Sequence, residues 1–424
     1  MNKIKLLIIT SDIPYPLSMG GNIAQFAFSD YLRHYIDISY IVPIYNNDDK
    51  NNVEKLKKKW ENVNIIEVCH PDYFFKEKHV FFRRVIRYIE NKILSNSKRN
   101  NQIFTNTSNA IFGAALWYLK PFFEEYIVSI SEAIKKIRPD IIQMEHSRCL
   151  SLAELESFNI PKIFIDHEVQ FGMLSSASEN TVRNAYTNYV IDLTKNIEIN
   201  LLKKFDGIFT FSKEDQLKLI ENGCANVEAI PFPILSEFFK SIDDKNFKIE
   251  KLVFVGGDIH FPNYDAIEWY SKELGKTVYD LFQLKLHIIG NWKKDNIQKF
   301  SCEYIIFEGY VEDLYSSTKN AINLVPIRMG AGIRTKILNS LAYSQPVITT
   351  KIGVEGIDII EEKHLLIFEN ITNLTEAISK LLNDRAKAIE MCKNAYEFVK
   401  INYSQEFLAK KRLEYFEILL SNKK

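Results

Sequence analysis

Residues 321–357 read AINLVPIRMGAGIRTKILNSLAYSQPVITTKIGVEGI and contain the clearest secondary-structure pattern of the chain. The short apolar run 322–326 predicts a buried parallel strand, and the residues that follow the turn predict a helix over 335–343. A second apolar run, 347–350, predicts another strand. Strand, helix and strand in this order are typical of a parallel sheet whose faces are covered by helices.

The turn between the first of these strands and the helix has the composition of an anion site. Gly330 and Gly332 let the backbone approach a ligand closely. Free N–H groups at the helix start, supported by the helix dipole, attract negative charge, and Arg334 and Lys336 add two cations there. The turn therefore predicts a site for a phosphorylated ligand, with solvated cations on an ordinary loop as the alternative.

Similar patterns fill the rest of the chain. Strands are predicted at 5–10, 36–43, 63–69, 140–145, 162–166, 207–211 and 227–230, and again at 252–256, 285–289, 304–307, 322–326, 347–350 and 365–368. Helical patterns separate most of them, which predicts an α/β protein with two parallel-sheet domains, the second starting near residue 250. A last amphipathic helix, 404–420, needs a surface to cover.

Length and composition exclude several classes of function. At 424 residues the chain exceeds one usual core, so two domains of roughly 200 residues each are expected. Its 54 basic and 54 acidic residues balance, which argues against a nucleic-acid partner. The five cysteines show no metal-chelating spacing and are expected to be reduced core thiols of a cytoplasmic protein. They are Cys69, Cys149, Cys224, Cys302 and Cys392.

Residues 73–99 interleave basic and aromatic side chains. At helical spacing such a pattern suits a bilayer interface, so this segment is a candidate peripheral contact with the inner face of a membrane. A helix with a solvated basic side and an apolar, core-facing side explains the same residues. The six-residue apolar run near the N-terminus is too short for a signal peptide or a membrane span and is interpreted as a first strand.

Each predicted domain opens with a strand followed by a glycine pair, Gly20-Gly21 and Gly256-Gly257. Ligands of open α/β sheets bind beyond the carboxyl ends of the strands, where such turns lie. Neither turn has the G-x-G-x-x-G spacing, so a dinucleotide cofactor is poorly supported, and both pairs are also compatible with ordinary turns. Ser212 is expected to cap a helix.

Three motifs together resemble the family-4 retaining glycosyltransferases, the glycosyl transferases group 1. They are GYVEDL at 309–314, VPIRMGAGIRTKIL at 325–338 and AYSQPVITTKIGVEGI at 342–357. The resemblance implies a GT-B fold, two Rossmann-like domains with a cleft between them. Residues 1–235 would bind the acceptor and residues 250–400 a nucleotide-sugar donor. The sequence leaves open which domain helix 404–420 covers, and packing back on the N-terminal domain is one candidate arrangement. The resemblance implies no metal and no other cofactor.

In this family backbone amides and basic side chains hold the donor's diphosphate, which assigns Arg334 and Lys336 to the leaving group. The family's two glutamates, eight positions apart, fall here on Ala331 and Asn339. Asn339 keeps one amide oxygen for a ribose hydroxyl, without the charge. The expected donor-binding residues are Gly20, Gly21, Gly256, Gly257, Gly330, Ala331, Gly332, Ile333, Asn339 and Glu355.

Two histidines, His146 and His167, follow predicted strand ends. A retaining transfer needs a hydrogen-bonding group near the reacting hydroxyl, and His167 is the catalytic candidate, its ring oriented by Asp166 and Glu168. Glu145 and His146 are the expected acceptor-side residues. Either histidine is also compatible with a structural role, bonded to the backbone.

The sequence therefore predicts an enzyme that moves a hexosyl group from a nucleotide-diphosphate sugar to a saccharide or lipid-linked acceptor, with retention. The alternative, motivated by Ala331 and Asn339, is a catalytically silent subunit that binds a sugar or a partner. A nucleotide-sugar epimerase or a phosphorylase on the same two-domain plan is a further alternative.

Overall fold

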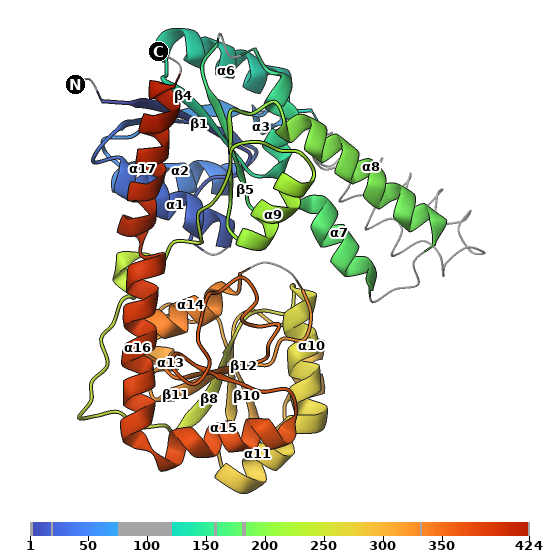
Figure 1. Cartoon of the computed structure of the whole chain (residues 1–424), viewed down its shortest axis with the longest axis vertical. Coiled ribbons are helices and arrows are strands. Elements are labelled where there is room, and N and C mark those ends of the chain that lie inside the picture. Colours follow the sequence, from blue (N-terminus) through green and yellow to red (C-terminus); the bar gives the residue numbers. More distant parts are fainter. Residues whose placement is uncertain are drawn as a thin grey trace. The chain divides into compact units, whose positions relative to one another are not determined.

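The computed structural model describes residues 3–17, 20–74, 121–156, 159–179, 184–330 and 333–422. It divides the chain into two compact units. Unit 1 comprises Met1–Ile230 and Ala409–Lys424, and unit 2 comprises Pro231–Leu408. Each unit is a parallel sheet with helices on both faces (Figure 1), which confirms the predicted α/β class with two Rossmann-like domains.

Unit 1 contains a seven-stranded parallel sheet in the order β3-β2-β1-β4-β5-β6-β7. The strands are β1 (Lys5–Thr10), β2 (Asp37–Ile44), β3 (Asn64–Cys69), β4 (Ile141–Glu145), β5 (Lys162–Asp166), β6 (Gly207–Thr210) and β7 (Val227–Ala229). Its helices are α1 (Gly20–Leu32), α2 (Asn47–Lys59), α3 (Pro71–Phe74), α6 (Glu124–Ile137), the 3-10 helix η2 (Ser147–Glu154), α7 (Gln170–Glu179), α8 (Ala185–Leu202), α9 (Lys213–Glu221) and most of α17 (Gln405–Ser421).

Unit 2 contains a six-stranded parallel sheet in the order β10-β9-β8-β11-β12-β13. The strands are β8 (Lys251–Val255), β9 (Leu286–Ile289), β10 (Ile305–Gly309), β11 (Ala321–Val325), β12 (Val347–Thr349) and β13 (Leu366–Ile367). Its helices are η3 (Ser236–Phe238), α10 (Phe261–Trp269), which continues through the π-turn η4 (Tyr270–Leu274) into α11 (Gly275–Phe282), α12 (Lys294–Phe300), α13 (Leu314–Thr318), α14 (Thr335–Ala342), α15 (Ile371–Asn383) and α16 (Arg385–Tyr403).

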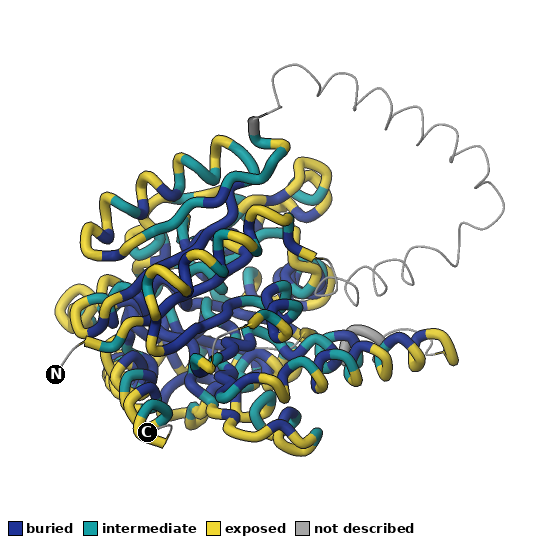
Figure 2. The backbone as a smooth tube through the Cα atoms, turned by 90° about the horizontal axis from the view of Figure 1, so that it is seen from above, coloured by how far each residue is buried: buried dark blue, intermediate teal, exposed yellow. Residues whose placement is uncertain are grey.

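All thirteen strands predicted from apolar runs are present, with boundaries that differ by at most two residues. The central strands are buried along almost their whole length, as the dark tube of Figure 2 shows, because helices cover both faces of each sheet. The strand order reverses between β1 and β4 in unit 1 and between β8 and β11 in unit 2. Such switch points are where ligands bind in open α/β sheets, beyond the carboxyl ends of the strands.

Helix α17 covers unit 1 with a narrow buried stripe. Ala409, Arg412 and Phe416 are each at most 1% exposed, and their spacings of three and four residues place them on one face. The Phe416 ring lies against Phe209 of β6, with ring centroids 6.4 Å apart. A helix was predicted at 404–420, but the buried arginine in its apolar stripe was not.

The cysteine expectation is correct only in part. All five thiols are free, and Cys149, Cys224 and Cys392 are buried. Cys69 is half-buried and Cys302 is exposed, so the prediction of core thiols is wrong for Cys302. Ser212 caps α9 as predicted, accepting a hydrogen bond from the Asp215 N–H at 3.1 Å.

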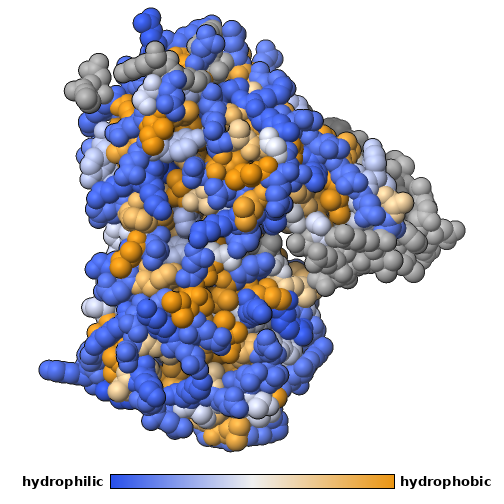
Figure 3. Space-filling view, in the orientation of Figure 1, coloured by the Kyte–Doolittle hydropathy of each residue, from blue (hydrophilic) through white to orange (hydrophobic). Residues whose placement is uncertain are grey.

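The candidate membrane segment, 73–99, lies outside the described residues except at its start. Among the residues that are described, no helix combines the length and the apolar character needed to cross a bilayer. Hydrophilic residues cover much of the face shown in Figure 3, with small hydrophobic groups between them.

Candidate functional site

The switch point of unit 2 brings several predicted phosphate-binding residues together. Gly256 and Gly257 follow β8, and Lys336 lies in the first turn of α14, which follows β11. Lys336 Nζ donates a hydrogen bond to Asn263 Oδ1 at 2.6 Å, and Asn263 Nδ2 donates to the Gly257 carbonyl at 2.8 Å. The Lys336 ammonium also lies 4.3 Å from the centroid of the Phe254 ring. One ammonium group is therefore held directly against the glycine turn.

Gly256 has no room for a side chain. Its φ is +152°, and a Cβ there would lie 2.7 Å from Asn263 Nδ2 and 2.8 Å from Lys336 Nζ. A Cβ on Gly290, which follows β9, would lie 2.8 Å from the Gly256 carbonyl carbon. Glycine at both positions is what lets the lysine and the asparagine meet over this turn.

The charge balance of this turn favours an anionic ligand. Burial and the neighbouring Arg334 cation lower the pKa of Lys336 to about 7. Arg334 is 9% exposed, and its Nη2 donates to the Gly330 carbonyl at 2.7 Å. No carboxylate of the described residues is within ion-pair distance of Lys336. A diphosphate would raise the pKa of Lys336 and offset the repulsion between the two cations.

The remaining predicted donor-binding residues of unit 2 are not part of the contact that Lys336 and Asn263 make with the glycine turn. Ala331 and Gly332 lie outside the described residues. Ile333 is half-buried just before the start of α14. Asn339, one turn into α14, has a buried amide oxygen with no hydrogen-bond partner among the described residues. Glu355 is exposed in the turn after β12. The amide oxygen of Asn339 is therefore an acceptor that no described residue uses, and its expected contact with a ribose stays a prediction.

The switch point of unit 1 gathers two histidines and a buried carboxylate. Glu145 is the last residue of β4, and His167 directly follows β5. His167 Nε2 and Glu145 Oε2 are 2.8 Å apart. The rings of His146 and His167 stack, with centroids 4.1 Å apart and planes inclined by 26°. His167, the catalytic candidate, therefore contacts both expected acceptor-side residues, Glu145 and His146.

The glycine pair of unit 1 forms the start of α1 rather than preceding it. Gly20 and Gly21 are the first two helical residues. A Cβ on Gly21 would lie 3.0 Å from His146 Cε1 and 3.3 Å from His167 Nδ1. The start of α1, which has no side chain at Gly21, therefore packs over both histidine rings, and Nδ1 of His167 faces it.

Glu145 orients the His167 ring, which corrects the role expected of Asp166 and Glu168. Asp166 Oδ1 instead accepts a hydrogen bond from the Glu168 N–H at 3.3 Å. Glu145 is 1% exposed, and its Oε1 accepts from Gln143 Nε2 at 2.6 Å. A carboxylate buried to this degree is placed to hold His167 rather than to contact an acceptor directly.

Glu145 is ionised despite its burial. Burial raises its pKa, but the hydrogen bond from His167 and the nearby Arg412 cation are among the causes that lower it by more, so the net shift is downward. An ionised carboxylate can only accept, so we assign the His167 proton to Nε2 and a lone pair to Nδ1. His167 thus offers a hydrogen-bond acceptor toward α1.

His146 is neutral and strained. Burial and repulsion by His167 lower the pKa of His146 to about 4. Its backbone has φ 70° and ψ 148°, a region that residues with side chains rarely adopt. Such strain persists where the surrounding structure fixes it, as the ring stack does here.

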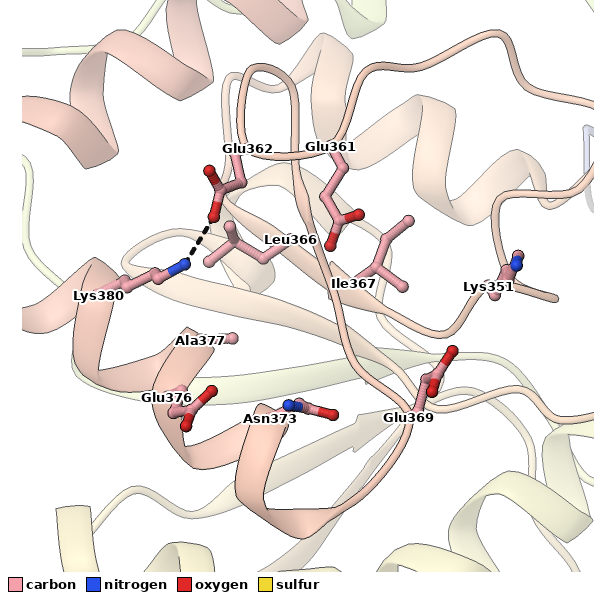
Figure 4. A pocket seen from close by; sticks show the side chains of 10 residues that line it. All are labelled: Lys351, Glu361, Glu362, Leu366, Ile367, Glu369, Asn373, Glu376, Ala377 and Lys380. Carbon is pink, nitrogen blue, oxygen red and sulfur yellow. Dashed lines mark hydrogen bonds and ion pairs between the residues drawn. The ribbon is translucent and has the colours of Figure 1, made fainter.

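A depression of unit 2 beside β13 and α15 lies at a different place. It measures about 370 Å³, and Figure 4 shows Lys351, Glu361, Glu362, Glu369, Glu376 and Lys380 around it, together with Leu366, Ile367, Asn373 and Ala377. Lys380 Nζ already pairs with Glu362 Oε1 at 2.6 Å, and the surplus of carboxylates would repel a diphosphate. Neither here nor elsewhere in the described residues do three His, Cys, Asp or Glu side chains form a group that could hold a metal ion.

Three residues of these sites were not singled out from the sequence. Asn263 belongs to an F-P-N sequence after β8. Its role depends on its contact with Lys336 of α14, a residue far away in the sequence. Gln143 shares a strand face with Glu145 two residues later. Arg412 could have been found as a charge between two core residues of one helix stripe, Leu408 and Phe416.

A comparison with known protein families matches part of unit 2. Residues 250–384, which include Gly256, Gly257 and Lys336, match the family model Glycosyl transferases group 1. This match supports a group 1 glycosyltransferase. The chain is also 21% identical over 428 aligned residues, 95% of this chain and 97% of the relative, to a Klebsiella pneumoniae protein described as an uncharacterized 44.6 kDa protein in cps region.

Solved structures share the fold over nearly the whole chain. Anabaena HepE in complex with UDP aligns with a TM-score of 0.64 at 12% identity, covering 98% of this chain and 100% of that one. A mutant of S. aureus TarM in complex with fondaparinux, alpha-GlcNAc-glycerol and UDP aligns with a TM-score of 0.64 at 14% identity, covering 97% and 99%. At these identities the likeness shows the fold, which is the GT-B glycosyltransferase fold.

Proposed function

We propose that this protein is a glycosyltransferase that moves a hexosyl group from a nucleoside diphosphate sugar to a saccharide or lipid-linked acceptor, with retention at the anomeric carbon. The family match supports the transferase class, and the HepE and TarM complexes, both with UDP, support a nucleotide-sugar donor. A role in polysaccharide biosynthesis is part of the proposal, supported by the relative described as in cps region.

The observation that carries the proposal is the cationic turn of unit 2. Lys336 is held against Gly256 by Asn263, and Arg334 lies two residues before it at the start of α14. Negative charge on a departing diphosphate grows as the bond to the sugar breaks, so cations fixed beforehand stabilise the transition state more than the ground state.

In the proposed reaction the bond between the anomeric carbon and the diphosphate oxygen breaks, and its electron pair goes to the diphosphate. The acceptor oxygen forms the new bond on the same face of the sugar, and its proton passes to the departing diphosphate. His167, with a lone pair on Nδ1, would accept a hydrogen bond from a sugar hydroxyl and so orient it.

A nucleotide panel tests this function. UDP, GDP, ADP and CDP, each added in large excess, are compared for their effect on the melting temperature, because a ligand of the native state stabilises it. At 100 times Kd the gain is about 2.7 kcal/mol, equivalent to several degrees. We expect one nucleotide to stabilise the protein and its sugar diphosphate to be turned over. If no nucleotide raises the melting temperature, the proposal fails.

Matched variants assign the effect to the turn. Arg334→Gln together with Lys336→Met should abolish nucleotide stabilisation and transfer, while circular dichroism remains native. Lys351→Met is the control, since it removes an exposed lysine from the acidic depression of the same unit. A nucleotide effect that survives the double variant, or that is lost with the control, would place the donor elsewhere. The anomeric configuration of the product, read by NMR, tests retention.

A second function is favoured by one observation. Asn339 stands where the resembled family carries a glutamate, and its amide oxygen is buried without a partner among the described residues. A catalytically silent subunit that binds a sugar or a partner would tolerate this loss of charge. Stabilisation by a nucleotide without turnover of any nucleotide sugar would favour it, whereas turnover in the Asn339→Glu variant alone would show that the asparagine suppresses activity.

A further inference from the structure

Helix α10 contacts the cationic turn of unit 2 at more than one point. Besides Asn263, which accepts a hydrogen bond from Lys336, α10 carries Asp265. Arg328, in the loop that follows β11, donates from Nη2 to Asp265 Oδ1 at 2.8 Å and from Nε to Asp265 Oδ2 at 3.1 Å. Two parallel hydrogen bonds between a guanidinium and a carboxylate fix direction as well as distance. The loop after β11 is therefore tied to α10 by a bidentate ion pair.

The surroundings of this ion pair hold the arginine in place. Asp265 is 7% exposed, whereas the Arg328 side chain is 41% exposed. The guanidinium carbon of Arg328 lies 4.8 Å from the centroid of the Trp269 ring, one turn further along α10. The Trp269 ring stacks on Phe368, with centroids 5.6 Å apart and planes inclined by 11°. A carboxylate and an aromatic face of the same helix thus orient one guanidinium.

The loop that Arg328 ties down also provides the partner of Arg334. Two residues after Arg328, the Gly330 carbonyl accepts a hydrogen bond from Arg334 Nη2 at 2.7 Å. Gly330 has φ +104°, and a Cβ there would lie 3.2 Å from Pro262 Cγ at the start of α10. The carbonyl that holds Arg334 therefore belongs to a segment that α10 contacts through both Arg328 and Pro262.

Arg328 differs from the other two cations near this turn. The contacts of Lys336 and Arg334 given above are to neutral oxygens, an amide and a carbonyl. Arg328 is instead paired with a carboxylate through two of its donors. A cation whose charge is matched in this way contributes little to an anionic ligand, but it fixes the backbone that carries it. The geometry therefore suits Arg328 for holding the loop rather than for binding phosphate.

We propose that Arg328 and Asp265 are positioning residues of the donor site, because their ion pair clamps the loop after β11 to α10. The clamped loop presents the Gly330 carbonyl, which orients Arg334 for the donor's diphosphate. The role of the diphosphate rests on the proposed function, whereas the link from Asp265 to Arg334 is a property of the protein alone. Helix α10 then holds both cations of the turn, Lys336 directly and Arg334 through the clamp.

The sign of one substitution separates this role from direct contact with the ligand. Asp265→Asn removes a negative charge near the turn, so a purely electrostatic effect, or an Arg328 that binds the diphosphate itself, predicts tighter binding. The clamp predicts binding weakened by about tenfold, because Arg334 loses its orientation. The probe is whichever of UDP, GDP, ADP and CDP stabilises the protein, and isothermal titration measures its affinity. Unchanged or tighter binding in Asp265→Asn overturns the proposal.

A matched control and two substitutions at position 328 sharpen this test. Asp280→Asn removes an exposed carboxylate of α11 that pairs with Lys276, and it should leave the affinity unchanged. Arg328→Lys keeps the charge but cannot make two parallel hydrogen bonds, so binding should weaken as in Asp265→Asn. Wild-type affinity in Arg328→Lys would show that only the charge matters and refute the clamp.

The double variant Arg328→Met with Asp265→Asn covers the case in which Arg328→Met, which leaves Asp265 unpaired, does not fold, because it removes both charges. Its affinity should equal that of Asp265→Asn, since the two side chains act as one unit. A further loss in the double variant would mean that Arg328 acts independently of Asp265, against the proposal.

NMR of the full chain with ¹⁵N-labelled arginine tests the clamp without any nucleotide. The Nε–H signals of Arg328 and Arg334 are assigned by their loss in Arg328→Lys and Arg334→Gln. Asp265→Asn should shift both signals, because Arg328 loses its carboxylate and Arg334 its fixed carbonyl, whereas Asp280→Asn should shift neither. An Arg334 signal that is identical in wild type and Asp265→Asn overturns the link. A shifted Arg334 signal without nucleotide binding would overturn only the proposed function.

Discussion

Lys336 Nζ and Asn263 Oδ1 are 2.6 Å apart, and this hydrogen bond joins the start of α14 to the helix that follows β8. The lysine fixes the amide orientation of Asn263, whose nitrogen then donates to the Gly257 carbonyl. A neutral partner satisfies the ammonium without neutralising it. The positive charge of Lys336 therefore remains available to a ligand.

Asn263→Asp should weaken nucleotide binding at least tenfold, because a carboxylate of the same size would neutralise Lys336 and repel a diphosphate. Isothermal titration with the nucleotide found by melting measures the change. Asn246→Asp, an exposed site in unit 2, is the matched control. Equal affinity in the wild type and Asn263→Asp would mean that the diphosphate does not bind at Lys336.

Donor affinity should fall as the pH rises above 7. The pKa of Lys336 in the free protein is about 7, below its ordinary value of 10.5, and a bound diphosphate would raise it. Between the free and bound pKa values binding takes up a proton, so affinity decreases by up to tenfold per pH unit. Calorimetry of a nucleotide sugar in two buffers of different ionisation enthalpy measures this uptake. Lys336→Arg, always charged, should bind without it; uptake that persists in this variant contradicts the assignment.

Gly256→Ala should remove nucleotide binding and lower the melting temperature by several degrees. The new methyl group would lie under 3 Å from Asn263 Nδ2 and Lys336 Nζ and would separate them. Gly223→Ala provides the control, since Gly223 also has a positive φ, of 82°, but meets only the flexible end of Lys203. Both variants should lose stability, whereas only Gly256→Ala should lose nucleotide affinity.

The stability of the protein should decline between pH 6.5 and 4 partly through His146. Its pKa is lowered to about 4 in the folded state, so below 6.5 the unfolded chain takes up a proton that the folded chain does not. Acid therefore favours unfolding across this window. His146→Asn should flatten the slope of unfolding free energy against pH there, measured by urea titration. An unchanged slope would show that His146 titrates normally.

The strands could be predicted because each is a continuous apolar run bounded by turns, a signal that is local in sequence. Gly256 and Lys336 could be proposed as site residues for a similar reason: close turns and helix starts are visible in short motifs. The hydrogen bond from Lys336 to Asn263 joins residues 73 positions apart and leaves no such local trace.

The orientation of His167 shows why the other contacts of the candidate site could not be predicted from the sequence. Sequence neighbours suggested Asp166 and Glu168, but adjacent residues of an extended chain point to opposite faces. Strand pairing places Glu145 beside Ile165, and His167, two residues later, lies on the same face. Register between β4 and β5 therefore decides the partner. The buried charge of Arg412 depends on a still longer connection, from α17 to the sheet of unit 1.

Unit 1 is discontinuous along the chain, since residues from Ala409 onward belong to it and the intervening residues, 231–408, form unit 2. During synthesis the first 230 residues leave the ribosome with Phe28 and Phe209 lacking the arginine and phenylalanine of α17 that later pack on them. The N-terminal sheet therefore reaches its final state only after the whole of unit 2 has been made. Premature termination anywhere between the two segments would yield a nascent protein with an uncovered apolar face, a natural substrate for chaperones and proteases.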